Sequence, residues 1–238
     1  MVIGAIFAGG SGSRMNCGET PKQYLPLGGK PVITHTAAKF FANPALEKIL
    51  ILCPAPWVDA TRAMMTEHFG ETDRITVLAG GQDRNGTLIR ALDYIQEQFG
   101  LFDETVIVTH DAVRPFVTQR MIDENIAAAK QYGACGTYIP ACDTIAESGD
   151  AETVTFIPER ARMYQTQTPQ SFKAKRLKAL LAALSGEEQA KLTDACMIYT
   201  LKGEPVRIVR GEVYNLKITY PVDLPVAEAL LQAGVGQD

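Results

Sequence analysis

The sequence is poor in the residues that build metal centres, disulfide frameworks and membrane spans. Its three histidines are scattered at positions 35, 68 and 110, so we do not expect a histidine-based zinc site. The five cysteines are odd in number and no two have C-x-x-C spacing, which favours reduced thiols in a cytoplasmic protein. No apolar run approaches the roughly 18–20 residues that cross a bilayer, and the amino terminus lacks the basic region of a signal peptide.

An excess of positive charge is also missing. The formal net charge of −4 argues against a general affinity for nucleic acid, so any anion site must be a local cluster. Hydrophobic residues make up 46% and charged residues 21% of the 238 positions, as in globular proteins with a sizeable core. Without a repeat or a linker, the sequence predicts a single domain over residues 1–238.

The most informative stretch is Val2–Leu25. It opens with the apolar run Val2–Ala8, which predicts a fully buried strand of a parallel sheet. A loop of glycine and serine follows at 9–13, and then come two cations, Arg14 and Lys22. Small residues let backbone N–H groups approach a phosphate, and open α/β sheets bind ligands where strands end. We interpret the stretch as a polyphosphate site; the alternative is a surface turn with two solvated charges.

The loop matches neither common phosphate fingerprint. Met15 stands where G-x-G-x-x-G needs its third glycine, which argues against a dinucleotide-dependent oxidoreductase. The lysine lies too far beyond Gly12 for G-x-x-x-x-G-K-[ST], and no Ser or Thr follows it. The phosphate site is therefore expected to be of another kind.

Apolar strands alternate with amphipathic helices through the first 140 residues. Strands are expected at 2–8, 48–53, 74–79, 105–109 and 135–140, and helices at 31–43, 57–69, 85–99 and 118–132. This alternation predicts an α/β fold of Rossmann-like type, with a mostly parallel sheet and helices on both faces. Further on, helices are expected at 172–184, from about 192–194 and at 221–233, and strands at 206–209 and 216–219.

Three of the predicted strands end in turns that carry glycine or charge: 9–14, 80–84 and 111–114. The carboxyl ends of parallel strands share one edge, so these turns are expected to form one composite site. It would be rich in cations, with Asp111 as the carboxylate at a strand end. Such a set suits phosphoryl-type transfer, where catalysis is mainly positioning and charge neutralisation. Asp111 would hold Mg²⁺; a helix cap or a salt bridge to Arg114 is the alternative.

The alternation breaks beyond Ala141. Residues 143–165 contain short β-like pieces around a turn at Gly149-Asp150, and we interpret them as an arm, a hairpin that leaves the main body. Exposed apolar residues on such an arm predict a dimer contact. A loop folded back onto its own domain is the alternative.

Two amino-terminal motifs, Ala8–Met15 and Pro21–Leu25, resemble those of nucleotidyltransferases that join a sugar or polyol phosphate to a nucleotide. Later motifs occur in the order typical of the cytidylyltransferase branch: Gly80–Arg84, Thr109–Pro115, Asp143-Thr144, Thr168–Gln170, Thr193-Asp194 and Asn215–Thr219. The loop Phe7–Gly10 and residues 164–170, 192–195 and 215–219 look closer to D-ribitol-5-phosphate cytidylyltransferases than to the related 2-C-methyl-D-erythritol 4-phosphate cytidylyltransferases.

The resemblance implies Mg²⁺-dependent transfer of CMP from CTP to D-ribitol 5-phosphate. The products would be pyrophosphate and CDP-ribitol, which serves teichoic acid or capsule biosynthesis. The alternative acceptor is 2-C-methyl-D-erythritol 4-phosphate of isoprenoid biosynthesis. The resemblance also implies a homodimer whose arms complete the acceptor sites, and no nucleic acid or membrane partner.

Family roles can be carried onto matching positions. Arg14 and Lys22 would be catalytic, stabilising charge on the α-phosphate and the departing pyrophosphate, and Asp111 would bind Mg²⁺. CTP would contact Ala8, Gly9, Gly10, Gly81, Gln82, Arg84, Thr87, Ala112 and Arg114. The acceptor would contact Thr144, Arg160, Thr168, Thr193 and Lys217. Family members often have an acidic residue at the position of Gln82 and serine at that of Thr87, so contacts there are expected mainly from the backbone.

The residues alone leave simpler roles open. Lys217 would be a solvated surface lysine. Arg160 would pair with Glu159 or Asp150, and Thr168 would be a turn residue before a proline. A nucleotide-sensing protein without turnover is the non-enzymatic alternative.

Overall fold

Strand β1 (Val2–Phe7) forms the centre of the fold. It pairs in parallel with β4 (Lys48–Cys53) on one side and β6 (Val106–Asp111) on the other, and all of its residues are buried. In this computed structural model, which describes residues 1–10, 15 and 20–236, the main sheet has seven strands in the order β5-β4-β1-β6-β8-β7-β9. Its outer strands are β5 (Ile75–Ala79) and β9 (Arg207–Arg210).

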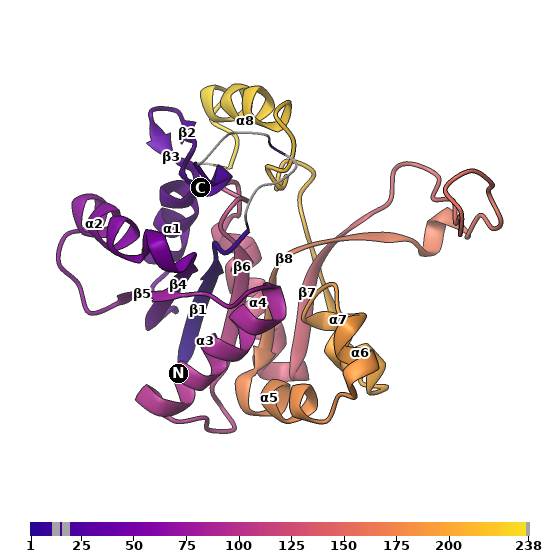
Figure 1. Ribbon diagram of the computed structural model, residues 1–238, viewed down its shortest axis with the longest axis horizontal. Helices are drawn as coiled ribbons and strands as arrows, with labels where there is room; N and C mark the ends of the chain where they lie inside the picture. Colours follow the sequence, from indigo (N-terminus) through magenta and orange to yellow (C-terminus); the bar gives the residue numbers. More distant parts are fainter. Residues whose placement is uncertain (11–14, 16–19, 237–238) are drawn as a thin grey trace.

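Helices cover both faces of this sheet because successive residues of β1 point to opposite sides. Val2 and Ile6 pack with α1 (Val32–Ala42), α2 (Val58–Phe69) and α4 (Gln119–Tyr132). Ile3 and Ala5 pack with helices of the other face. These helices are α3 (Arg84–Phe99), α5 (Ala174–Ala182) and α7 (Cys196–Leu201), with the short α6 (Gly186–Ala190) beside them (Figure 1). Helix α8 (Asp223–Gln232) packs on β2 (Pro26–Leu27) through a smaller cluster of hydrophobic side chains. Strand β2 pairs with β3 (Lys30–Pro31).

The first half of the chain confirms the predicted α/β architecture. Each strand and helix expected before residue 141 is present, with boundaries that differ by at most two residues. The strand expected at 216–219 is wrong, because this segment is irregular. It contacts the body through several bonds, among them one from the Ile218 N–H to the Val113 carbonyl, 2.9 Å long. The helix expected from residue 172 begins at Ala174, because the preceding residues belong to a strand.

That strand, β8 (Tyr164–Lys173), lies antiparallel between β6 and β7 (Ala134–Pro140). Its buried stretch includes Gln167, Thr168, Gln170 and Ser171, so no apolar alternation marks it. Hydrogen bonds replace apolar packing along this strand; the Thr109 hydroxyl, for example, donates to the Gln170 carbonyl over 2.9 Å. Hydrophobic periodicity therefore gave no sign of a central strand here.

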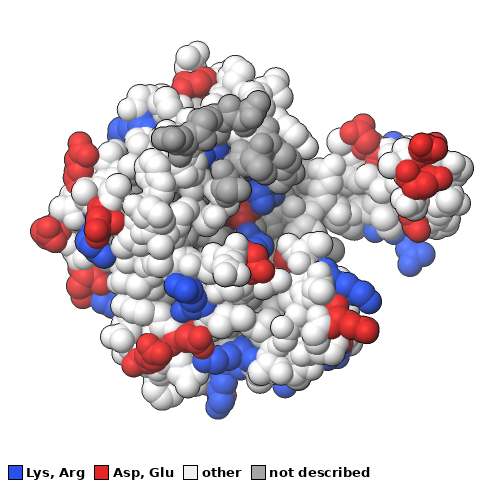
Figure 2. Space-filling view, in the orientation of Figure 1, with Lys and Arg blue, Asp and Glu red and all other residues white. Residues whose placement is uncertain are grey.

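Residues 141–163 leave the body between β7 and β8 and form a projecting arm (Figure 1). One antiparallel bridge, between Glu147 and Phe156, joins its two limbs. Figure 2 shows acidic side chains gathered at the end of this arm. Val154, Phe156 and Ile157 are each more than half exposed on it. This segment overlaps the arm expected at residues 143–165, and its role in dimerisation stays a prediction. Among the described residues, no helix is both long and apolar enough to cross a membrane.

Helix α4, which packs against β6, β7, β8 and β9 of the sheet, begins at a side-chain cap. The Thr118 hydroxyl accepts a bond from the Met121 N–H over 3.2 Å. We expect Thr118→Ala to lower the free energy of unfolding by about 1 kcal/mol, since the buried N–H loses its acceptor. Thr118→Ser keeps the acceptor and should stay near wild type. Urea unfolding followed by circular dichroism measures both, and equal losses in the two variants would contradict the cap.

Candidate active site

A cavity of about 380 Å³ lies at the carboxyl ends of β1 and β6. In Figure 2, basic and acidic atoms adjoin in the hollow at the centre of this face. The cavity is lined by Phe7, Ala8, Gly9, Gly10, Lys22, Gln23, Gln82, Asp83, Arg84, Thr87, Asp111, Val113, Lys217 and Thr219. The turns after β1, β5 and β6 thus meet at one edge of the sheet, as the parallel topology predicts.

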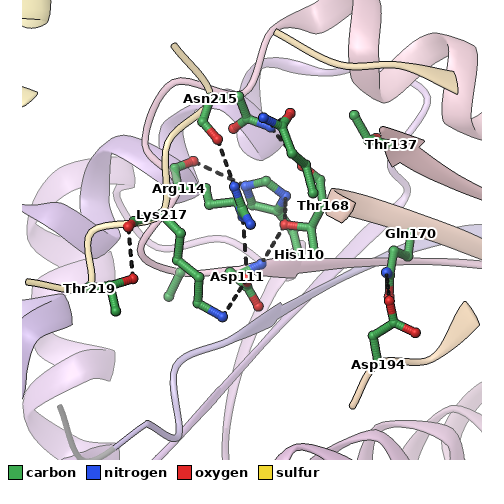
Figure 3. A network of polar contacts seen from close by, with 12 residues as sticks. His110, Asp111, Arg114, Thr137, Thr168, Gln170, Asp194, Asn215, Lys217 and Thr219 are labelled. Carbon is green, nitrogen blue, oxygen red and sulfur yellow. Dashed lines mark hydrogen bonds and ion pairs between the residues drawn. The ribbon is translucent and has the colours of Figure 1, made fainter. Parts of the chain in front are cut away.

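Asp111, the last residue of β6, is the electrostatic centre of the cavity. Three cations from separate segments surround its carboxylate, which is 7% exposed. Arg84 bonds one oxygen of the carboxylate. Lys217 Nζ lies 3.1 Å and Arg114 Nε 3.4 Å from the other oxygen (Figure 3). The structure thus brings Lys217 into the site rather than leaving it as a solvated surface lysine.

Burial and these cations act on Asp111 in opposite directions. Desolvation by burial would raise the pKa of the carboxyl, but Arg84, Lys217 and Arg114 together hold that pKa well below its usual range. Asp111 is therefore a carboxylate at neutral pH. The cluster carries a net positive charge of about two, which favours a polyphosphate as its ligand.

The turn between β5 and α3 supplies a rigid backbone wall. Gly81 must be a glycine, because a Cβ there would lie 2.3 Å from the backbone carbon of Gly86. The Gly81 N–H donates to the Thr87 hydroxyl over 3.0 Å, and that hydroxyl donates to the Asp83 carbonyl over 2.7 Å. The Asp83 side chain caps α3 by accepting from the Gly86 N–H. Arg84 then opens the helix and points its guanidinium at Asp111.

A short helical turn, η1 (Lys22–Tyr24), brings the predicted catalytic residue Lys22 to the cavity. Lys22 Nζ donates to the Ile218 carbonyl over 2.8 Å, and the Gln23 side-chain amide donates to the Ala8 carbonyl. The loop after β1 is thereby tied to the segment that carries Lys217.

Behind Asp111 lies a layer of buried polar groups. His110 is fully buried, with Nδ1 2.9 Å from the Thr168 hydroxyl and Nε2 3.1 Å from the Arg114 carbonyl oxygen (Figure 3). Burial lowers the pKa of this histidine to about 4, so its imidazole is neutral. Arg114 Nη1 reaches past it to the Asn215 carbonyl, 2.7 Å away.

The predicted site residues divide by position. Those in the cavity wall are Ala8, Gly9, Gly10, Lys22, Gln82, Arg84, Thr87, Asp111 and Lys217. Ala112, Arg114 and Thr168 are buried and do not line the cavity, and half-buried Gly81 precedes the wall residue Gln82. Thr144 and Arg160 are exposed on the arm, and Thr193 is exposed before α7, so none of these three lines the cavity of its own chain. Arg14 lies outside the described residues.

Several wall residues were not predicted: Phe7, Gln23, Asp83, Val113 and Thr219. Gln23 and Thr219 stand in motifs beside predicted lysines, and this adjacency was the available signal. Phe7 looked like an ordinary core residue, although the Arg84 guanidinium lies over its ring at 5.3 Å. No role was predicted for His110, because the three histidines are scattered along the sequence.

The donor set is compatible with one divalent cation held mainly by a substrate. Among the described residues, no three His, Cys, Asp or Glu side chains gather as a metal cluster. Mg²⁺ in nucleotide sites is usually bound by one or two carboxylates together with phosphates and water. Asp111 fits that requirement, and Asp83 lines the same cavity.

A family model described as 2-C-methyl-D-erythritol 4-phosphate cytidylyltransferase matches residues 2–233. The chain belongs to this cytidylyltransferase family. It is therefore a nucleotidyltransferase, and the predicted enzyme class is confirmed.

Solved structures agree with this assignment. A 4-diphosphocytidyl-2C-methyl-D-erythritol synthase from Anaerococcus prevotii is 26% identical, with a TM-score of 0.80 over 98% of this chain and 96% of that one. The 2-C-methyl-D-erythritol 4-phosphate cytidylyltransferase of Francisella tularensis is 25% identical, with a TM-score of 0.77 over 95% and 99%. That of Thermus thermophilus is also 25% identical, with a TM-score of 0.73 over 98% and 100%.

Asp111 should govern stability as well as chemistry. Asp111→Asn leaves three cations facing one another without an anion, so we expect the free energy of unfolding to fall by about 3 kcal/mol at pH 7. Because the folded-state pKa lies below the roughly 3.9 of an unfolded aspartate, the wild-type advantage should be complete above that pH. It should then shrink as pH falls from about 4 towards the folded-state pKa.

Urea unfolding at a series of pH values measures this difference. Asp103→Asn, which removes an exposed carboxylate paired with Lys175, is the matched control and should leave stability unchanged. Equal stability of Asp111→Asn and wild type at pH 7 would show that the buried cluster contributes nothing net.

Proposed function

We propose that the protein transfers CMP from CTP to D-ribitol 5-phosphate, forming CDP-ribitol and pyrophosphate. One observation carries the choice of reaction: a buried carboxylate and several cations converge on a glycine-walled cavity at the ends of β1, β5 and β6. This arrangement supports phosphoryl-type transfer, because it offers charge neutralisation and backbone donors where a polyphosphate would lie.

The acceptor's phosphate would attack the α-phosphorus of CTP in line, forming a new P–O bond as the bond to pyrophosphate breaks. A phosphate is already an anionic nucleophile, so the step needs no general base. Lys22 would neutralise charge on the leaving pyrophosphate, and Arg84 and Lys217 would take up phosphate oxygens. Arg14 is assigned the same task as Lys22 from its sequence alone.

Asp111 would hold a magnesium ion between the protein and the nucleotide's phosphates. When bound, the ion supplies Lewis-acid stabilisation of the charge that develops on the phosphates. The Gly81–Thr87 turn would contact the cytosine and ribose through its backbone, since its side-chain hydroxyl is already engaged within the turn.

The choice of D-ribitol 5-phosphate as acceptor rests on the resemblance of four stretches of the sequence. The loop Phe7–Gly10 and the segments 164–170, 192–195 and 215–219 look closer to ribitol-phosphate enzymes. Segments 164–170 and 215–219 adjoin the candidate site through Thr168 and Lys217, which supports a role in acceptor choice. A second candidate is 2-C-methyl-D-erythritol 4-phosphate, favoured by the family model and by the names of the solved relatives.

Pyrophosphate release from CTP decides between the two acceptors. We expect kcat/KM for D-ribitol 5-phosphate to exceed that for 2-C-methyl-D-erythritol 4-phosphate by about 100-fold or more, since buried groups that bind hydroxyls discriminate strongly. UTP in place of CTP is the nucleotide control. A preference for the methylerythritol substrate would move the assignment to the second candidate. Release with neither acceptor from folded protein would overturn the proposed function.

We further propose that the active form is a homodimer with shared sites. Thr144 and Arg160 are exposed on the arm, away from the cavity of their own chain. Val154, Phe156 and Ile157 give the same arm an apolar surface that a second subunit would cover. In such a dimer, Arg160 of the partner subunit would add a cation for the acceptor's phosphate.

Mixing two inactive variants tests the shared site. Lys22→Ala removes a cation from the body of one subunit, and Arg160→Ala removes one from its arm; each homodimer should lose most of its turnover. In heterodimers formed by co-expression, one of the two sites would be intact, so the mixture should recover about a quarter of the wild-type rate. Circular dichroism checks folding. Tagged heterodimers with no recovered activity would show that each subunit uses its own arm, and an active Arg160→Ala homodimer would show that the arm is not used.

A further inference from the structure

The polar layer behind Asp111 forms a closed circuit of hydrogen bonds that joins four segments (Figure 3). The Asp111 N–H donates to the Thr168 hydroxyl over 3.1 Å, which lies 2.9 Å from His110 Nδ1. His110 Nε2 lies 3.1 Å from the Arg114 carbonyl, and Arg114 Nη1 donates to the Asn215 carbonyl. The Asn215 side-chain amide donates back to the Thr168 carbonyl over 2.9 Å.

The direction of the central bonds follows from their partners. A carbonyl oxygen only accepts, so His110 Nε2 carries a proton and donates it to Arg114. The buried Thr168 O–H also needs an acceptor, and His110 Nδ1 lies within reach of it at 2.9 Å, so the hydroxyl donates to Nδ1. The remaining lone pairs of that hydroxyl receive the Asp111 N–H. We name these three bonds the His110 relay: Asp111 N–H to Thr168, Thr168 O–H to His110, and His110 Nε2–H to Arg114.

The relay leaves the Thr168 hydroxyl with no proton to offer a substrate. Thr168 is 3% exposed and is absent from the cavity wall, and Arg114 likewise lies behind Asp111. The Arg114 guanidinium bonds Asp111 on one side and the Asn215 carbonyl on the other, two residues before Lys217. The circuit thus holds the backbone of Asp111 and that of Asn215, two residues before its partner Lys217.

We propose that His110 and Thr168 are positioning residues that fix the Asp111 carboxylate for the nucleotide's metal. This role replaces the direct acceptor contact that resemblance implied for Thr168, and it rests on the proposed use of CTP with a divalent cation. Outer-shell partners of this kind typically change metal affinity or activity by about 10–100-fold when removed.

Calorimetric titration of CTP into the full-length protein, with Mg²⁺ and separately with EDTA, tests the relay. Thr168→Val removes the hydroxyl at constant shape. His110→Gln can still donate to the Arg114 carbonyl but offers nothing at Nδ1. We expect each to raise the Kd for CTP about 10-fold or more in Mg²⁺ and to change it little in EDTA. The double variant should lose no more than either single one, since the bonds act as a unit. Thr168→Ser, which keeps the hydroxyl, should restore the affinity.

Thr137→Val is the matched structural control. Thr137 is a fully buried threonine of the neighbouring strand β7, and its hydroxyl donates to the Pro169 carbonyl over 2.8 Å. Its loss should lower the melting temperature and leave the Mg²⁺-dependent Kd in place. If Thr137→Val raised the Kd for CTP as much as Thr168→Val does, the effect of the relay variants would be a general loss of stability, and the proposal would be overturned. An unchanged Kd in Thr168→Val, with a raised KM for the acceptor, would overturn the proposal in favour of direct contact.

The calorimetric comparison needs no acceptor, so the two proposals fail separately. Wild-type protein that binds CTP in Mg²⁺ but turns over neither acceptor overturns the proposed reaction while the variants still decide the relay. Wild-type protein that does not bind CTP overturns both.

Discussion

The buried ion cluster around Asp111 is the interaction on which the rest of the site depends. One carboxylate at the end of a central strand holds Arg84 from α3, Arg114 from the turn after β6 and Lys217 from an irregular segment near the carboxyl terminus. A buried carboxylate is strongly unfavourable unless it is paired, and three cations would repel one another without it. Each partner therefore requires the other, and the cluster fixes three distant segments at one point.

The ion cluster around Asp111 also prepares the cavity for an anionic ligand. Its cations exceed its anions, and their pairing with Asp111 keeps the excess charge oriented towards the cavity. Phosphate oxygens entering there would give Arg84 and Lys217 new partners at little cost in reorganisation, since the side chains are already held in place. Preorganised charge of this kind is a main source of rate enhancement in group transfer to and from phosphates.

The sequence predicted the half of the fold that apolar periodicity encodes. Buried strands such as Val2–Phe7 and Lys48–Cys53 carry continuous apolar runs, and their parallel alignment brought the turns at 80–84 and 111–114 to one edge as expected. Strand β8 was missed because its buried side chains are polar and satisfied by partners far away in the chain. Lys217 was expected in the site only from the motif at 215–219, and its pairing with Asp111 was not expected, because only the fold brings the two within 3.1 Å.

The polar character of β8 has a physical origin in the site itself. A site that must hold charge inside a sheet needs polar groups in the strand beside it, and such a strand cannot follow the apolar pattern of its neighbours. β8 runs against β6, so Thr168 lies next to the carboxyl end of β6 and its hydroxyl meets the backbone of Asp111. Apolar residues at these positions would leave the Asp111 N–H and the ring of His110 without partners in the core. The departure from the expected pattern in β8 thus lies next to the site because the site requires it.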